Sequence, residues 1–263
     1  MRITSWNILH GQSLEPAENS SFAEVAAEFL SDVIALQEVD RNLARSANID
    51  QTTLIANAMK AQWHGFAPTV VGTPGVKWRK LKDNERQVFT TDSASDDMYG
   101  ISIVSIVPVK KWFRLELGKS LIGMPLLVAN EKGRVAPFYV KDEPRVALAA
   151  VLENGWTIIN THLSFVPLVN IYQLLKITRW AKKLEKEYAT KVILLGDFNL
   201  PWGLPTKVTR WKRATQSLTY PSWKPQISFD YILMREEDID WAKEVTMPGV
   251  SISDHRPITV EIA

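Results

Sequence analysis

The chain has no cysteine among its 263 residues. This absence excludes disulfide bonds, thiolate metal sites and a cysteine nucleophile. No apolar run approaches the ~20 residues that a membrane-spanning helix needs, and Met1 is followed directly by a predicted strand, which leaves no room for a signal peptide. We therefore expect a cytoplasmic protein. Histidine is scarce too, so a site built on imidazole has only four candidates: His10, His64, His162 and His255.

A strong charge imbalance is also missing, because 31 Lys and Arg face 29 Asp and Glu and leave a net charge of +2. Proteins that bind the nucleic-acid backbone usually carry a larger basic excess or a basic stripe. The best candidate stripe is Lys207–Arg213, where four cations surround Trp211 and could contact phosphates and stack a base. Lys207 and Arg210 are its candidate substrate contacts. The alternative interpretation is a solvated loop or helix face.

The hydrophobic pattern predicts a few helices among many short strands. Helical spacing follows the N-capping pair Ser20-Ser21 as far as Leu30, and recurs over residues 51–61 and Asn170–Tyr188. Short β-branched segments predict strands near residues 2–5, 33–36, 67–71, 100–106, 146–152, 155–160, 191–195, 227–233 and 257–262. This order favours an α/β sandwich with one shared core. Residues 77–98 and 118–144 are expected to be long exposed loops.

Polar groups stand within or at the end of six segments that should be buried. Gly196-Asp197-Phe198-Asn199 follows an apolar strand, and its carboxylate and amide point the same way because strand side chains alternate. One such placement needs no function, since buried polar groups can be satisfied by hydrogen bonds. Six indicate a shared cleft, and we expect a single domain over residues 1–263. The other five segments are Trp6-Asn7, Gln37-Glu38, Asn160-Thr161-His162-Leu163, Phe229-Asp230-Tyr231-Ile232-Leu233 and Ser253-Asp254-His255-Arg256-Pro257.

In this order the six segments resemble the motifs of the endonuclease/exonuclease/phosphatase superfamily, the deoxyribonuclease I-like metal-dependent phosphoesterases. The resemblance runs from Trp6 to Pro257 and so covers essentially the whole chain. It implies a four-layer α/β/β/α sandwich, in which two mixed β-sheets pack face to face with helices outside. It also implies a hydrolase that uses a divalent metal to break a phosphate ester.

Phosphate-ester hydrolysis needs a cation on the phosphate oxygens, an activated water and help for the leaving group. Hard oxygen ligands select Mg²⁺ or Mn²⁺ rather than zinc. Glu38 is the expected primary ligand, and Asp254 and Asn7 would complete or orient the metal's shell. Gathering Glu38, Asp197 and Asp254 in one cleft costs like-charge repulsion, which a divalent cation relieves.

The candidate catalytic residues are His162, Asp197, Asn199, Asp230 and His255. Asp230 would hold the His255 imidazole in one tautomer, and this pair is a candidate base or a cation bound to the scissile phosphate. In the family the Asp of the GDxN motif is an alternative water activator, so Asp197 and His255 both stay open for that role. Asn199 would orient water or bind phosphate, and His162 would stabilise charge in the transition state.

Candidate substrate contacts lie close to Glu38 in the sequence. Arg41 and Arg45 could hold a phosphate in bidentate fashion, with an exposed loop as the alternative, and Arg145 is a weaker candidate. Tyr99 stands where abasic-site endonucleases usually carry an Asn. Those enzymes also carry a Lys two positions after the metal-binding Glu, where this chain has Asp40. The abasic-site endonuclease branch is therefore disfavoured.

We predict a Mg²⁺-dependent phosphodiesterase, with a nuclease preferred and no obligate protein partner, and we expect a monomer. A lipid- or inositol-phosphate hydrolase is the alternative, for which exposed apolar contacts could come from Trp202, Trp211, Trp223 and Leu121 to Leu127. A catalytically silent binding module is less favoured. Silent copies lose the metal Glu or the His pair, and this chain keeps both.

Overall fold

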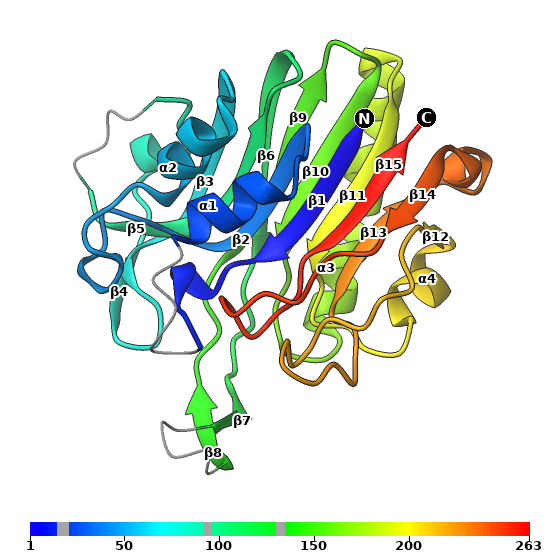
Figure 1. The fold of residues 1–263 in the computed structure, drawn as a ribbon. Coiled ribbons are helices and arrows are strands. Elements are labelled where there is room, and N and C mark those ends of the chain that lie inside the picture. The colour runs from blue at the N-terminus through cyan, green and yellow to red at the C-terminus, as the bar shows by residue number, and fades with distance from the viewer. Residues whose placement is uncertain (15–20, 92–95, 130–134) are drawn as a thin grey trace.

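Two large β-sheets form the centre of the structure, a computed structural model that describes residues 1–14, 21–91, 96–129 and 135–263 (Figure 1). The first sheet has the order β14-β15-β1-β2-β5-β3-β4 and the second has the order β12-β13-β11-β10-β9-β6. Both sheets are mixed, because β1 and β2 run parallel in the first and β10 and β11 run parallel in the second. The first sheet comprises β14 (Ala242–Val245), β15 (Ile258–Ile262), β1 (Arg2–Asn7), β2 (Val33–Arg41), β5 (Met98–Ser105), β3 (Trp63–Thr73) and β4 (Lys77–Lys80). The second comprises β12 (Lys212–Arg213), β13 (Asp230–Met234), β11 (Lys191–Asp197), β10 (Trp156–His162), β9 (Arg145–Leu152) and β6 (Val109–Gly118).

Alternation along the strands builds four layers. In β9, Val146 and Leu148 enter the core between the sheets, whereas Ala147 and Ala149 face outward to a second core with helix α3 (Val169–Tyr188). Helices α1 (Phe22–Glu28) and α2 (Gln51–Met59) cover the outer face of the first sheet. The α/β/β/α sandwich is therefore confirmed. Shorter helices are α4 (Leu204–Thr209) and the 3₁₀ turns Leu9–Gly11, Ala44–Ser46, Asp83–Glu85 and Glu236–Trp241.

The predicted elements match the observed ones best where the pattern is long. Helix α1 begins after Ser21, which forms a capping box with Glu24, but the helix ends before Leu30, whose side chain is 76% exposed rather than on the inner stripe. The strand expected over residues 227–233 begins only at Asp230. Ser20 lies outside the described residues.

The two expected loops contain more structure than the sequence indicated. The stretch 77–98 contains β4 and the start of β5, and Phe89 bridges to Phe66 of β3. The stretch 118–144 contains a hairpin of β7 (Met124–Ala129) and β8 (Val135–Val140), which projects beyond the sandwich in Figure 1. Both segments gain order by pairing strands, which turn residues and charges alone do not reveal. Within the described residues, no helix is long and apolar enough to cross a membrane.

The carboxyl ends of β1 and β2 in one sheet and of β10 and β11 in the other meet at one edge of the sandwich. A buried amide pair fixes this edge, because Gln37 Nε2 donates to Asn160 Oδ1 at 2.7 Å across the two sheets. Asn160 Nδ2 in turn donates to the carbonyl oxygens of Leu36 and Ser102, each at 2.8 Å. These bonds hold β2 and β5 of the first sheet against β10 of the second.

Gly196 in β11 is required by the close approach of β10. Its φ is +134°, and a Cβ there would collide with the Thr161 carbonyl oxygen. Gly196→Ala is expected to destabilise the protein by about 3 kcal/mol or more, because backbone strain adds to the collision. Gly155→Ala is the matched control: its φ is +87° and its Cβ would meet nothing within 4 Å, so about 1–2 kcal/mol is expected. Urea unfolding measures both. Equal losses of unfolding free energy in the two variants would show that β10 moves away from residue 196 without an energetic cost.

Candidate active site

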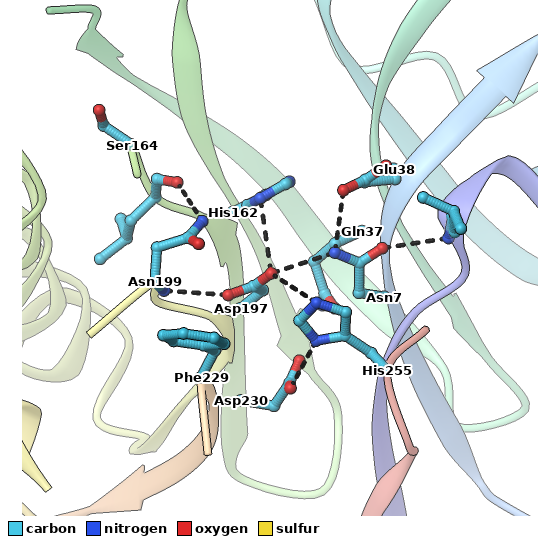
Figure 2. Close-up of polar contacts among 12 residues, drawn as sticks. Asn7, Gln37, Glu38, His162, Ser164, Asp197, Asn199, Phe229, Asp230 and His255 are labelled. Carbon is cyan, nitrogen blue, oxygen red and sulfur yellow. Dashed lines mark hydrogen bonds and ion pairs between the residues drawn. The ribbon is translucent and has the colours of Figure 1, made fainter. Parts of the chain in front are cut away.

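Glu38 lies in a bulge of β2. The pairing of β2 with β5 shifts between Leu36 and Val39, and Glu38 itself has a φ of +56°. A bulge of this kind re-aims a side chain, and here it turns the carboxylate toward Asn7 at the end of β1. Asn7 Nδ2 donates to Glu38 Oε1 at 3.1 Å and to Asp197 Oδ2 at 3.1 Å (Figure 2). Since its Oδ1 accepts from the Leu9 N–H at 3.1 Å, Asn7 orients the two carboxylates through its nitrogen.

Asp197 is the point where the polar groups converge. Its Oδ1 accepts from the Asn199 backbone N–H at 2.9 Å. Its Oδ2 lies 3.6 Å from His162 Nε2 and 3.7 Å from His255 Nε2 (Figure 2). The carboxylate is buried and therefore takes its direction entirely from these neighbours.

His255 is held by a carboxylate and by the first strand. Its Nδ1 pairs with Asp230 Oδ2 at 2.8 Å, which points Nε2 toward Asp197. The His255 carbonyl oxygen accepts from Trp6 Nε1 at 3.2 Å, and the neighbouring Ser253 hydroxyl donates to the Asn7 carbonyl oxygen at 2.6 Å. The His–Asp pair that the sequence predicted therefore exists in the structure.

The two histidines have opposite electrostatic surroundings. Burial, the Arg145 charge and the His255 charge lower the pKa of His162 well below its usual value. Burial also acts to lower the pKa of His255, but the charges of Asp230 and Asp197 outweigh it and raise this pKa well above the usual value. Near neutral pH the site thus combines a neutral imidazole with an imidazolium.

The carboxylates are strained electrostatically. Burial raises the pKa of Asp197 to about 6, although the His255 charge acts to lower it. Burial and then the Asp254 charge raise the pKa of Glu38 to about 7, against the Asn7 hydrogen bond. Both shifts mean that negative charge is costly here when no cation is present.

The residues present fit a hard divalent cation. Glu38 and Asp254 offer oxygen donors, and their mutual repulsion is what such an ion relieves. Ligand atoms of Asp197, Asp230 and His255 also lie within 4.8 Å of one another. We assign that group to proton handling, because Asp230 and His255 use those atoms on each other. Glu38 and Asp254 are therefore the residues that would hold the ion.

The other predicted residues have mixed outcomes. Asn199 Nδ2 donates to the Leu163 carbonyl oxygen at 3.0 Å, which fixes the loop after β10, so its role toward water or phosphate stays a prediction. Arg45 donates to both oxygens of Asp40 at 2.8 and 2.7 Å and lies over the Tyr99 ring. Tyr99 is buried, and its pKa is raised by burial and then by the Glu38 charge. Arg45 and Tyr99 remain beside Glu38 as predicted substrate contacts.

The prediction that Arg41 contacts substrate is wrong. Its side chain is 1% exposed, pairs with Asp50 at 3.1 Å and packs its guanidinium over the rings of Phe89 and Phe66. It serves the core of the first sheet instead. Asp50 also caps α2 by accepting from the Thr52 N–H at 3.0 Å, which gives the arginine a fixed partner.

The predicted basic stripe Lys207–Arg213 is also not a continuous surface. Trp211 is buried, Lys212 pairs with Glu236 at 2.9 Å, and Arg213 donates to Ser228 Oγ at 2.8 Å. Lys207 and Arg210 remain exposed, at the end of α4. They stay predicted contacts, without the stacking tryptophan between them.

Arg145 is the residue that sequence reasoning undervalued. It is buried, pairs with Glu143 at 2.8 Å and with Asp142 at 3.3 Å, and its charge acts on both His162 and Tyr99. The signal was the run Asp142-Glu143-Pro144-Arg145 directly before a wholly apolar strand, where three charges can be buried only together. Tyr220 was missed as well, and its ring lies 5.0 Å from that of His255.

The fold and the site together define a phosphoesterase of the deoxyribonuclease I-like class. The chain belongs to the Endonuclease/Exonuclease/phosphatase family, whose model matches residues 4–255. Members of this family are hydrolases that act on phosphate esters, generally with a divalent metal, so this chain is an enzyme of that kind. No curated protein sequence matches the chain.

Solved structures share the fold at low sequence identity. A mannosyl-6-phosphatase of Bacteroides thetaiotaomicron is similar with a TM-score of 0.61 and 12% identity, over 100% of this chain and 99% of that one. The catalytic domain of human Nocturnin gives 0.59 and 15%, over 99% and 93%. A 3′ phosphatase from Neisseria, bound to a product DNA hairpin, gives 0.51 and 17%, over 100% and 99%. Such identities show the fold alone.

Proposed function

We propose that this enzyme is a Mg²⁺- or Mn²⁺-dependent phosphodiesterase. The observation that carries the proposal is the convergence of His162 Nε2 and His255 Nε2 within 4 Å of one oxygen of Asp197, next to the carboxylate of Glu38. We further propose that residues 1–263 act as one domain, since Asn7 of the first strand and His255 near the last belong to the same site, and that the enzyme is a monomer.

The chain's own groups divide the chemistry. When bound by Glu38 and Asp254, Mg²⁺ supplies neutralisation of the phosphate charge. The attacking water loses its proton to the Asp197–His255 pair, whose facing atoms lie 3.7 Å apart. Asp230 keeps the His255 ring oriented, and the neutral His162 offers a hydrogen bond to a phosphoryl oxygen as charge develops. Arg145 and Arg45, each paired with carboxylates of its own, hold guanidinium groups near Glu38.

The test is hydrolysis of bis(p-nitrophenyl) phosphate with Mg²⁺, Mn²⁺ and EDTA, alongside nicking of supercoiled plasmid. We expect metal-dependent release of nitrophenol, faster from the diester than from p-nitrophenyl phosphate. Plasmid nicking that is lost in His255→Gln would favour the nuclease. No metal-dependent hydrolysis of any of these esters would contradict the proposal.

Hydrolysis of a membrane phosphodiester is the second candidate function. A specific observation favours it: several large apolar side chains are exposed in the loops next to the site, together with lysines, whereas the predicted DNA-binding stripe is partly buried.

A further inference from the structure

Large apolar side chains stand exposed in the loops around the active site. The loops are residues 118–125, 139–144, 163–172, 198–210 and 216–228, which lie next to the ends of β6, β8, β10, β11 and β13. The apolar rim, as we call this set, consists of Leu121 (97% exposed), Ile122 (66%), Tyr139 (59%), Leu168 (76%), Tyr172 (59%), Trp202 (76%), Leu218 (46%) and Trp223 (61%). Large exposed apolar residues gathered at one site mark an interaction surface.

Hydrogen bonds connect these loops to one another and to the catalytic groups. Asp142 Oδ2 accepts from the Ser120 N–H at 2.6 Å and from Ser164 Oγ at 2.9 Å, which joins the first three loops. Asn170 Nδ2 donates to the Asn199 carbonyl oxygen at 3.1 Å, which joins the third to the fourth. The Ser222 N–H donates to the Asp254 carbonyl oxygen at 2.7 Å and ties the fifth loop to the metal-binding segment. The loops that carry the apolar rim are therefore tied to one another or to the active-site segments.

The exposed charged side chains of the same loops are all positive. Their acidic residues, Asp142 and Glu143, are buried and paired with Arg145. The exposed charged residues in these five described segments are Lys119, Lys141, Lys207, Arg210 and Lys224. All are positive, although the whole chain has nearly as many acidic as basic residues.

We infer that the apolar rim docks the enzyme on an anionic phospholipid bilayer, so that the active site faces the phosphodiesters of lipid headgroups. This inference rests on the proposed function for its substrate, but not for the docking itself. Lysines are drawn to an anionic leaflet, tryptophan and tyrosine prefer the bilayer interface, and Leu121, Ile122 and Leu168 gain by leaving water. Aliphatic side chains have no face on which a nucleic-acid base stacks, so the rim fits lipid better than a single strand.

Flotation with vesicles tests the docking without turnover. In EDTA, the native protein is expected to bind phosphatidylcholine vesicles that contain phosphatidylserine, and to bind less as salt rises. Leu121→Asp and Leu168→Asp should each lower partitioning about tenfold. The double variant Lys119→Glu, Lys141→Glu should lower partitioning about fivefold for each lysine replaced.

Leu30→Asp is the matched control. Leu30 and Leu168 are each 76% exposed and each have positive φ, +50° and +69°, but Leu30 lies beside the start of β1, at the opposite edge. The inference would be overturned if Leu30→Asp lowered vesicle binding as much as Leu168→Asp does, or if the native protein did not bind the vesicles. It would also be overturned if single-stranded DNA displaced the vesicles from the protein and Leu121→Asp did not change the binding of that DNA. Hydrolysis of bis(p-nitrophenyl) phosphate should be unchanged in Leu121→Asp. Vesicle binding with no hydrolysis would refute only the proposed function.

Discussion

His255→Gln is expected to lower phosphodiester turnover by about 10³-fold while the protein stays folded. His255 supplies a titratable nitrogen, Nε2, that faces Asp197, and its other ring nitrogen is fixed by Asp230 at 2.8 Å. Removing a positioned acid–base group costs 10²–10⁴-fold, and loss of the nearby positive charge adds to this. Steady-state hydrolysis of bis(p-nitrophenyl) phosphate with saturating Mg²⁺ gives the measurement.

Asp230→Asn separates orientation from chemistry. Without the carboxylate, the pKa of His255 loses one of the charges that raise it, so the pH profile should shift to lower pH and kcat should fall by a smaller factor than in His255→Gln. His64→Gln, in β3, is the control and should retain full turnover. Native activity in His255→Gln would remove this residue from the mechanism.

Glu38→Gln is expected to abolish metal-dependent turnover and yet to stabilise the metal-free protein. Burial and the Asp254 charge raise the pKa of Glu38 from 4.5 to about 7. Since the folded state then holds this proton more tightly than the unfolded state does, stability falls as pH rises from about 4.5 to 7. Glutamine cannot ionise, so at pH 8 in EDTA the variant should be more stable by on the order of 2 kcal/mol. At pH 4 the two proteins should differ little.

Thermal melting at both pH values, in EDTA and with millimolar Mg²⁺, checks these expectations. Mg²⁺ should raise the melting temperature of the native protein and leave Glu38→Gln almost unchanged. Glu143→Gln is the contrasting control, because its carboxylate is the nearer of the two that pair with buried Arg145, at 2.8 Å against 3.3 Å for Asp142, and its loss leaves the guanidinium with one ion pair. That variant should be destabilised at pH 8. A native melting temperature identical in EDTA and Mg²⁺ would refute the metal site.

The sequence predicted the sandwich and the central residues because both depend on local order. Apolar strands such as Val192–Leu195 end in polar residues, and the ends of parallel strands must share an edge. Arg41 was misjudged for the opposite reason. Its partners Asp50, Phe66 and Phe89 come from three separate segments, and only the packed structure shows that they enclose the guanidinium.

The sequence pattern also does not show which charged side chains are paired in the folded protein. Lys207, Arg210, Lys212 and Arg213 form a basic run in the sequence, but Lys212 turns to Glu236 and Arg213 to Ser228. Conversely, Arg145 stands beside Asp142 and Glu143 in the sequence, but only the packed structure shows that all three are buried together. The hairpin β7–β8 was missed because its stability comes from cross-strand pairing, which turn-rich composition hides.

The hydrogen bonds from Trp6 to His255 and from Ser253 to Asn7 span almost the whole sequence, and β1 pairs with β15. Contacts between such distant residues make folding slow, because a long loop must close before they form. The active site therefore forms only when β15 and the segment before it have joined β1. Recovery of activity during refolding should follow the last folding phase, since hydrolysis begins only when the final strand joins the first.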